Sequence, residues 1–566
     1  MRRRRLRMLA VLLAMAAIFF LLAGRLIQLM LFSPEERLQS IRHVRRFFSV
    51  HEARRGNIYD RNGGALAVTV PAVEIGIDPR SLGESMDDVL AGLAAYLPAS
   101  REELRAIVDG RRTKFPQTRW VSLADRVPEA VFEKIQEKKW PGVHGQRKFL
   151  RFYPQHSAAC HVVGFLNRDG HACCGVEKFA DFFLQGQDGW VLSEKDGRRQ
   201  ELRQFRSHGI SEKNGHGVYL TIDLAVQRLA EEELDRMVRD FSPDSAVIIV
   251  GEAGSGKLLA LACWPNYDPN DFSHASMGHL RNRAICDCYE PGSVFKIVAV
   301  AAGLEEGIVL PGTIFHCAED HFVHEGHSYP LPHDHSNFGD LTLTDVLRKS
   351  SNRGSAQIAI RLGPETFYSY VRRFGFGECT GYGGGCDGEI AGILQPPQLW
   401  DGLTITRMPM GHAIAVTPLQ IHQAMGVLAA DGYLVAPQLV EKVVSEKNDE
   451  KMWQNYPVIR HQVLGHHTVV QLRAMLANPL DDLVDGRFPF ACKTGTSQKI
   501  VAGRYVHDRH VASCSGFFPA DRPKFVITVV VDSPKTDGKI GWGSRYAKPT
   551  FRYIAEQMAR MGVQTN

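Results

Sequence analysis

The first thirty or so residues limit what this chain can become. Five arginines lie within residues 1–7, and the stretch from Met8 to Gly24 then runs for 17 residues without a charge. Apolar residues continue to Phe32, so the segment 8–32 is long enough to cross a bilayer as one helix. Arginines that precede a membrane span favour a cytoplasmic location for the N-terminal end of that span. This predicts a cytoplasmic tail over 1–7, a membrane anchor over 8–32 and everything else outside.

A cleaved signal peptide begins with the same basic and apolar pattern. The apolar stretch here is longer than such a peptide needs, and no small-x-small cleavage site ends it. Three arginines follow the span, fewer than the five that precede it: Arg42, Arg45 and Arg46. The sequence therefore favours an uncleaved, single-pass anchor with its arginine-rich end in the cytoplasm.

The charge balance indicates what the outer part does not bind. The 566 residues include 67 Lys and Arg against 62 Asp and Glu, a net +5, and the five N-terminal arginines account for the whole excess. Hydrophobic residues make up 44% and charged residues 23%, which is typical of globular domains and excludes a disordered chain. No basic field is left over the remaining surface, so we expect no nucleic-acid partner.

Residues 33–215 are predicted to form an irregular α+β domain. They contain a turn-rich hairpin around Asn62–Gly63 and a largely helical pattern over 100–140. A polar run over Asp196–His216 is typical of a linker and separates this domain from residues 216–566.

The second domain starts with a strand at Val218–Ile222 and an amphipathic helix near Leu224–Phe241, and it ends with a helix from about Pro549. Further strands are predicted at Ala246–Val250, Leu258–Ala262, His510–Phe518 and Phe525–Val531. Because strands come from both ends of the domain with helices between, we expect one sheet assembled from distant segments and flanked by helices.

A serine and a lysine three residues apart open an apolar helix in this domain. Ser293 and Lys296 lie on one face at the start of a helix whose next turns, 297–302, are apolar all round and therefore buried. Burial lowers the pKa of a lysine, so a neutral Lys296 amine could accept the Ser293 proton. A lysine that only extends past an N-capping serine would show the same spacing, and SxxK alone is a weak signal.

Two more motifs follow in order. Ser350-Ser351-Asn352 begins 57 residues after Ser293, and Lys493-Thr494-Gly495-Thr496 begins 143 residues after Ser350. SxxK, SDN and KTG together are the signature of serine β-lactamases and penicillin-binding proteins, and Ser350-Ser351-Asn352 (SxN) stands here for the SDN motif. The three motifs in this order are a specific signal for acyl transfer.

Each motif residue has an expected task in that chemistry. Ser293 attacks a carbonyl, Lys296 accepts its proton, and Ser350 relays a proton to the departing amine. The other predicted site residues bind and orient the substrate: Asn352 holds its amide, Lys493 supplies charge and organises Ser350, Gly495 lets its backbone approach, and Thr494 and Thr496 hold a carboxylate. The backbone N–H groups of Ser293 and Thr496 are expected to form the oxyanion hole.

Over almost its whole length the chain resembles the class B penicillin-binding proteins, the membrane-anchored D,D-transpeptidases of peptidoglycan synthesis. Residues 55–63 are similar to the family's RGxIxDRNG, and three short sequences of the second domain match as well: Leu220–Asp223, Asn282–Ala284 and Gly516–Pro519. The division-type, FtsI-like branch is the most similar, through Tyr289–Ser293, Arg373–Gly377 and Gly392–Pro397.

The resemblance implies a pedestal, or dimerisation, domain over 33–215 and a β-lactamase-like transpeptidase domain over 216–566 with an antiparallel sheet. It implies crosslinking of stem peptides that end in D-Ala-D-Ala, through an acyl-Ser293 intermediate with loss of D-Ala. It further implies inhibition by β-lactams, and an FtsW-like glycosyltransferase and other division proteins as partners. The protein is then expected in the bacterial inner membrane at the septum, with its catalytic domain on the periplasmic side. The resemblance implies no cofactor or metal.

Several alternatives stay open on the sequence. An elongation-type transpeptidase, a D,D-carboxypeptidase and a β-lactam-binding sensor would share the three motifs. A class A β-lactamase would need a water-activating group, and no ExxLN sequence lies between Ser350 and Lys493. The family commonly has other residues at Val294, His412 and Cys492, which leaves β-lactam affinity open. The third stem-peptide residue and the oligomeric state cannot be predicted.

Cysteines and histidines allow two further interpretations. Of the 11 cysteines, Cys379 and Cys386 could close a small loop, although buried free thiols are the simpler expectation. The segment 316–335 holds six histidines and Cys317. Their spacing matches no standard zinc pattern, so an exposed loop leading to Ser350 is preferred over a metal site.

Overall fold

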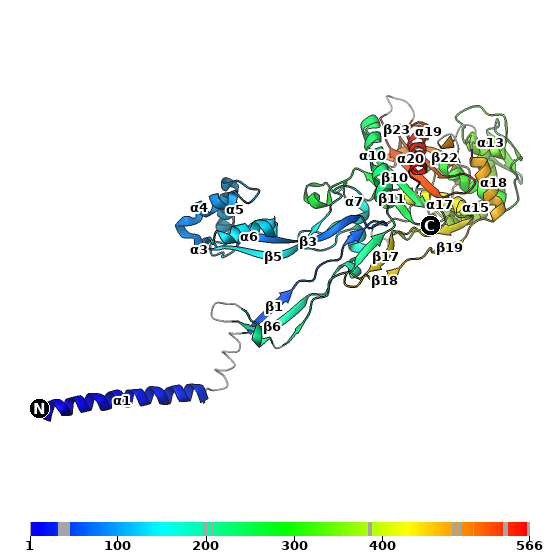
Figure 1. Cartoon of the computed structure of the whole chain (residues 1–566). Helices are drawn as coiled ribbons and strands as arrows, with labels where there is room; N and C mark the ends of the chain where they lie inside the picture. Colours follow the sequence, from blue (N-terminus) through cyan, green and yellow to red (C-terminus); the bar gives the residue numbers. More distant parts are fainter. Residues whose placement is uncertain are drawn as a thin grey trace. The chain divides into compact units, whose positions relative to one another are not determined.

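The structure is a computed structural model of the whole chain (Figure 1). It describes residues 2–31, 46–195, 201–206, 208–382, 388–477, 483–484, 488–501, 503–535 and 541–562. The chain divides into two compact units, one formed by 1–54 and 186–214 and the other by 55–185 and 215–566, and each is described by itself.

The first unit contains the N-terminal helix and a small sheet. Helix α1 (Arg2–Leu31) is, among the described residues, the one helix that is long and apolar enough to cross a membrane. In the sheet, β6 (Gly189–Lys195) pairs antiparallel with β1 (Arg46–His51), β7 (Glu201–Leu202) and β8 (His208–Ile210). The run expected to be a linker therefore contributes two short strands, whose polar side chains gave no apolar alternation.

The second unit begins with the predicted hairpin, which the structure confirms. Strand β2 (Ile58–Tyr59) pairs antiparallel with β3 (Ala65–Ile77) across a turn in which Gly63 has a φ of +88°. Strand β3 also pairs with β4 (Val121–Val127) and β5 (Val143–Phe152). A small core lies between this sheet and helices α4 (Met86–Ala94), α5 (Arg101–Lys114) and α6 (Glu129–Glu137).

The same sheet continues into the second half of the chain. Strand β2 pairs in parallel with β9 (Gly217–Leu220), which pairs with β17 (Val440–Val444), and β17 pairs with β18 (Lys451–Gln454). Strands from opposite parts of the sequence thus belong to one seven-stranded sheet.

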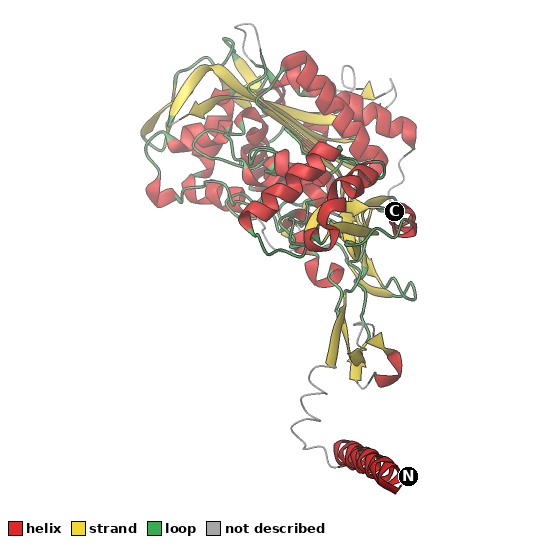
Figure 2. Ribbon diagram, turned by 90° about the vertical axis from the view of Figure 1, so that its left-hand side faces the viewer, coloured by secondary structure: helices red, strands yellow, loops and turns green. Residues whose placement is uncertain are grey.

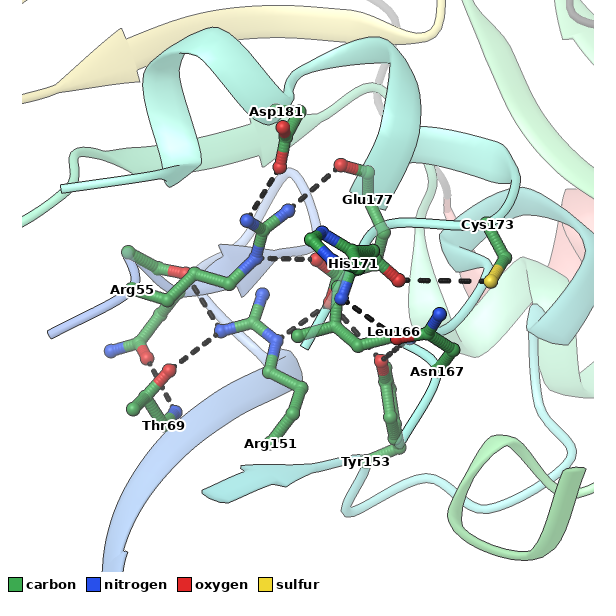
Figure 3. A network of polar contacts seen from close by, with 12 residues as sticks. Arg55, Thr69, Arg151, Tyr153, Leu166, Asn167, His171, Cys173, Glu177 and Asp181 are labelled. Atoms are coloured by element: carbon green, nitrogen blue, oxygen red, sulfur yellow. Dashed lines mark hydrogen bonds and ion pairs between the residues drawn. The ribbon is translucent and has the colours of Figure 1, made fainter. Parts of the chain in front are cut away.

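A buried ion-pair network fixes the base of this region (Figure 3). The Glu177 carboxylate, whose side chain is fully buried, binds Arg55 Nε at 2.8 Å and Arg151 Nε at 2.6 Å. Arg55 also binds Asp181, and Arg151 donates to the Gly56 carbonyl at 2.7 Å. Two guanidinium groups therefore offset the cost of burying the Glu177 carboxylate.

The core of the second half is a five-stranded antiparallel sheet in the order β11-β10-β24-β23-β22. Its strands are β10 (Ser245–Glu252), β11 (Leu258–Trp264), β22 (Ala491–Val501), β23 (Arg504–Phe518) and β24 (Phe525–Asp532). Segments from both ends of this domain therefore meet in one sheet, as predicted, except that the strand expected at Val218–Ile222 is β9 of the seven-stranded sheet. Strand β22, which carries Lys493–Thr496, is an edge strand.

Helices cover both faces of this sheet, as Figure 2 shows. Helices α10 (Leu224–Phe241) and α20 (Lys548–Met561) share one apolar cluster with the strands, and α17 (Pro418–Ala429) packs against β23 and β24. Helix α12 (Lys296–Glu305) lies in a larger helical core with almost every residue buried, which confirms the predicted all-round burial.

Shorter elements connect these parts. They are α3 (Pro79–Leu82), η1 (Gly83–Ser85), α7 (Cys160–Val163), α8 (Gly175–Phe179), α9 (Asp181–Leu184), η2 (Arg203–Phe205), η3 (Pro269–His274), α11 (Arg283–Cys286), η4 (Gly292–Phe295), β12 (Ile314–His316), β13 (His321–His324), β14 (His327–Pro330), β15 (Asp340–Thr342), α13 (Leu343–Arg348), α14 (Asn352–Leu362), α15 (Pro364–Arg373), η6 (Pro397–Leu399), α16 (Thr404–Arg407), η7 (Met408–Met410), β16 (Tyr433–Val435), β19 (Ile459–Gln462), α18 (His466–Leu476), β20 (Leu483–Val484), β21 (Phe488–Pro489) and α19 (Gly543–Tyr546).

Candidate active site

Ser293 lies in the 3₁₀ turn η4, directly before α12. The preceding Gly292 has a φ of +56°, and a Cβ there would come within 2.6 Å of the Thr496 carbonyl oxygen. Its N–H donates to the Gly411 carbonyl at 3.2 Å. Glycine at 292 is therefore what lets the Ser293 turn pack directly against the backbone of β22.

Lys296 is fully buried, and its ammonium nitrogen faces the Ser350 motif. Nζ donates to Asn352 Oδ1 at 2.7 Å, to Ser350 Oγ at 3.1 Å and to the Ser350 carbonyl. Burial holds the pKa of Lys296 well below its ordinary value, the charge of Lys493 lowers it further, and Asp334 acts in the opposite direction. Burial and Lys493 thus make the neutral amine, the form that can accept a proton, easier to reach than in an exposed lysine.

Ser350 lies between α13 and α14 with a left-handed backbone, at a φ of +61°. This conformation costs a non-glycine residue on the order of 1 kcal/mol, so the surrounding contacts must hold it. Its Oγ accepts from Lys296 Nζ at 3.1 Å and from Lys493 Nζ at 3.0 Å. The hydroxyl therefore joins two of the predicted motifs to its own.

Lys493 extends from the edge strand β22 and is almost fully buried. Besides Ser350, it donates to the Thr494 carbonyl at 3.1 Å. Burial lowers the pKa of Lys493 to about 8, although Cys492 and Cys514 act to raise it. Lys493 is thus able to exchange a proton near neutral pH.

The rest of the KTG strand alternates between two faces. Thr494 and Thr496 are half-buried, and Thr496 Oγ1 accepts from the Gly543 N–H at 3.0 Å. Gly495 points the other way, where a Cβ would lie 2.6 Å from both the Pro291 carbonyl oxygen and Ser513 Oγ. Glycine at 495 therefore also lets β22 contact the loop before Ser293, while its expected role in admitting the substrate backbone stays a prediction.

Asn352 is the third residue of the SxN motif, and its amide is held at both ends. Oδ1 accepts from Lys296, and Nδ2 donates to the His333 carbonyl at 2.7 Å. These bonds fix which way the amide faces and leave it one further N–H to donate.

Asp334 is a site residue that sequence reasoning missed. Its carboxylate accepts from Ser351 Oγ at 2.7 Å, from the Arg353 N–H at 3.3 Å and from the Asn352 N–H. Asp334 therefore binds the first turn of α14, where backbone N–H groups lack helical partners. The only available signal was a carboxylate in the His-rich segment, and its spacing from Ser350 matches no motif.

The His-rich segment supports α14 through its backbone. The carbonyls of Cys317 and His316 accept from Arg353 and Gln357, at 3.1 and 3.0 Å. Within the described parts of the chain, no group of three or more His, Cys, Asp or Glu could hold a metal ion. Cys386, the suggested partner of Cys379, lies in 383–387, outside the described residues.

Cys492, one of the departures from the family pattern, lines a cavity together with Lys493. The cavity is also lined by Thr494, Arg348, Lys548, Met475 and Ser544. Cys492 also packs against the apolar cluster that α10 and α20 share with the sheet, so a change at position 492 alters both the surroundings of Lys493 and the edge of this cluster.

The fold and site together define a class of protein. The site has a serine at the start of a buried helix, two buried lysines that contact a second serine, and an edge strand beside them. This is the arrangement that the three motifs indicate in serine β-lactamases and penicillin-binding proteins.

Comparison with known proteins makes this specific. The family described as penicillin binding protein transpeptidase domain matches residues 246–556, and penicillin-binding protein dimerisation domain matches residues 50–172. The chain belongs to the class B penicillin-binding proteins.

Similar proteins cover nearly the whole chain. Peptidoglycan D,D-transpeptidase FtsI of Escherichia coli K12 is 30% identical to this chain, and the alignment covers 88% of this chain and 82% of FtsI. Stage V sporulation protein D of Bacillus subtilis is also 30% identical, and the alignment covers 91% of this chain and 79% of that protein. The structure of penicillin-binding protein 3 of Mycobacterium tuberculosis complexed with aztreonam superimposes with a TM-score of 0.67 at 27% identity and covers 92% of this chain and 98% of that one.

Proposed function

We propose that this chain is a serine-type peptidoglycan D,D-transpeptidase. The observation that carries the proposal is the Ser350 hydroxyl, which lies within hydrogen-bond distance of both Lys296 and Lys493. This links the base, the proton relay and the substrate strand in one buried network. The FtsI and penicillin-binding protein similarities agree with the activity.

In the first half of the reaction, Ser293 Oγ attacks the carbonyl of the penultimate D-Ala, and its proton passes to the neutral Lys296 amine. The tetrahedral oxyanion lies against the N–H groups of Ser293 and Thr496, each donor worth about 3 kcal/mol by analogy with other oxyanion holes. The C–N bond then breaks, the proton reaches the leaving nitrogen through Ser350 Oγ, and D-Ala departs.

In the second half, a stem-peptide amine attacks the Ser293 ester. Ser350 and Lys296 take the proton of the amine, the C–O bond of the ester breaks, and Ser293 Oγ regains a proton as the new peptide bond forms. Asn352, with its remaining amide N–H, orients the donor amide, while Lys493, Thr494 and Thr496 bind its terminal carboxylate. β-Lactams fit the same groups and stop at the acyl-enzyme.

Covalent labelling tests this proposal. The full chain in detergent should be labelled by a fluorescent penicillin, and Ser293→Ala should abolish labelling while keeping the melting temperature. A label that persists in the Ser293→Ala variant would overturn the assignment of the nucleophile. A wild-type chain that takes no label would overturn the proposal as a whole.

A second assay separates transpeptidation from carboxypeptidation. Lipid-linked precursor is incubated with a polymerising glycosyltransferase and an amine acceptor, with and without the wild-type chain. Crosslinked dimers are expected, whereas trimmed tetrapeptide alone would identify a D,D-carboxypeptidase, and acylation without any product would identify a β-lactam sensor.

We further propose that residues 1–7 are cytoplasmic, 8–32 span the inner membrane, 33–215 form a periplasmic pedestal and 216–566 the transpeptidase domain. Five arginines in the first turns of α1, ahead of its apolar stretch, support this orientation. The similarity to FtsI favours a septal role beside an FtsW-like glycosyltransferase. A functional fluorescent fusion should concentrate at the septum, and an even distribution along the side wall would favour the elongation alternative.

A further inference from the structure

Glu290 lies three residues before Ser293 with its carboxylate buried. Oε2 lies 2.9 Å from His412 Nδ1, and the Tyr505 hydroxyl donates to both oxygens, at 3.1 and 3.2 Å. The Ala413 N–H donates to Oε1 at 3.0 Å. One carboxylate therefore joins the loop before Ser293, the turn 411–413 and strand β23.

The turn at 411–413 is itself pressed against the Ser293 loop. Gly411 has a φ of +86°, and a Cβ there would lie 2.1 Å from the Gly292 carbonyl oxygen. The Gly292 N–H donates to the Gly411 carbonyl at 3.2 Å. A shift of this turn therefore displaces the backbone on which the Ser293 N–H depends.

Tyr505 approaches Glu290 from the other side. It lies on β23 opposite Ile500 of β22, in the part of the hairpin beyond Thr496. Burial and the nearby carboxylate of Glu290 raise the pKa of Tyr505 to about 12, so its hydroxyl keeps its proton at any physiological pH. Through Tyr505, Glu290 is tied to β23, which pairs with β22, the strand that carries Thr496.

We propose that His412 and Tyr505 are positioning residues that act through Glu290 to set the spacing between Ser293 and Thr496. This inference rests on the proposed acyl transfer at Ser293. Among the described residues, His412 and Tyr505 are the titratable side chains bound to the Glu290 carboxylate. Of the two side chains, only an imidazole can carry a positive charge in its contact with the carboxylate.

The charge change predicts a signature that a purely structural role would not give. A protonated His412 binds Glu290 as a charge-assisted pair, whereas a neutral His412 can offer only an ordinary N–H donor. Replacing His412 should therefore slow acylation more at low pH than at high pH. Replacing Tyr505, which stays protonated throughout, should slow acylation by the same factor at every pH.

The experiment measures the second-order rate constant for acylation of the full chain by a fluorescent penicillin at pH 5.5 and 8.5. The ratio of wild type to His412→Phe is expected to be about tenfold at the lower pH and about threefold at the higher one. The ratio for Tyr505→Phe should be constant. Glu290→Gln, which keeps the shape but removes the charge, should show the same pH trend as His412→Phe.

His274→Phe is the matched control, because His274 forms a pair with Asp271 in η3 and its side chain is 81% exposed. It should acylate like wild type at both pH values. Equal ratios at the two pH values for both His412→Phe and Glu290→Gln would overturn the inference, as would wild-type rates in either variant. A wild-type chain that is not labelled at all would instead refute the proposed function.

Discussion

Lys296 and Lys493 donate to the same oxygen, Oγ of Ser350, at 3.1 and 3.0 Å. Two buried amines this close cannot both carry a charge without strong repulsion, because little water lies between them to screen it. The charge of Lys493 therefore lowers the pKa of Lys296. The arrangement keeps a proton acceptor and a proton donor side by side around one hydroxyl.

This arrangement predicts how stability depends on pH. Burial lowers the pKa of Lys493 from 10.5 to about 8 in the folded chain. Between about pH 8 and 10.5 the unfolded chain binds one proton more than the folded chain, so stability rises with pH, by up to about 3 kcal/mol for this shift. Below pH 8 both states are protonated and the burial penalty is present in full.

Lys493→Met should remove this gain. Urea unfolding followed by circular dichroism at pH 7.5 and 10 is expected to show a smaller rise in stability for the variant than for wild type. Lys134→Met, which replaces an exposed lysine of α6, should keep the wild-type rise. If Lys493→Met and wild type gained equally, Lys493 would not be the group that titrates.

The buried network of Figure 3 predicts a loss of stability away from the active site. Glu177→Ala leaves Arg55 and Arg151 without their shared carboxylate, and breaking a buried pair in this way typically costs about 3–5 kcal/mol. Denaturant midpoints check the loss. Glu129→Ala removes the partner of Arg147, which is two-thirds exposed, and should change stability by less than about 0.5 kcal/mol. Equal effects of the two substitutions would contradict the role given to Glu177.

The fold could be predicted from sequence wherever a local pattern was strong. The amphipathic period predicted helix α10 over Leu224–Phe241, and apolar runs predicted β10, β11 and β24 to within a few residues. Strand β23 was predicted too, but it begins at Arg504 and not at His510. The strands β7 and β8 were missed because short polar strands have no alternation to detect.

The candidate site likewise contains residues that the sequence could identify and residues that it could not. Ser293, Lys296, Ser350, Asn352 and Lys493 could be named because each lies in a motif with fixed spacing, and the structure brings Lys296, Ser350, Asn352 and Lys493 into direct contact. Asp334 and Glu290 could not be assigned roles, since their importance comes from contacts between segments far apart in sequence. The contact of Gly495 with the loop before Ser293 could not be predicted either, because it also joins segments far apart in sequence.

Asp334 is predicted to act on both the shape and the charge of the site. Its carboxylate holds the first turn of α14 and raises the pKa of Lys296 against the effect of burial. Asp334→Asn should slow acylation about tenfold at its plateau, because charge-assisted bonds to Ser351 and the helix are weakened. It should also move the rising limb of the pH profile to lower pH, since Lys296 then loses its proton more readily.

Acylation rates measured from pH 5 to 9 distinguish these effects. Asp340→Asn is the matched control: Asp340 follows in the same part of the chain and pairs with His316, and its side chain is 62% exposed. This variant should keep both the plateau and the midpoint of wild type. A slower plateau with an unchanged midpoint in Asp334→Asn would leave Asp334 a purely structural support.

Gly495→Ala tests whether β22 must touch the Ser293 loop. The added Cβ would lie 2.6 Å from the Pro291 carbonyl oxygen, and neither backbone can move aside without separating the strand from the loop. Overpacking of this kind typically costs about 1–3 kcal/mol, so we expect acylation to slow about tenfold and the melting temperature to fall.

Gly426→Ala is the matched control, because a Cβ at Gly426 of α17 meets no atom within 4 Å. There alanine should leave acylation unchanged and stabilise the helix by up to about 1 kcal/mol. Wild-type acylation in Gly495→Ala would show that the strand and the loop can separate without affecting Ser293.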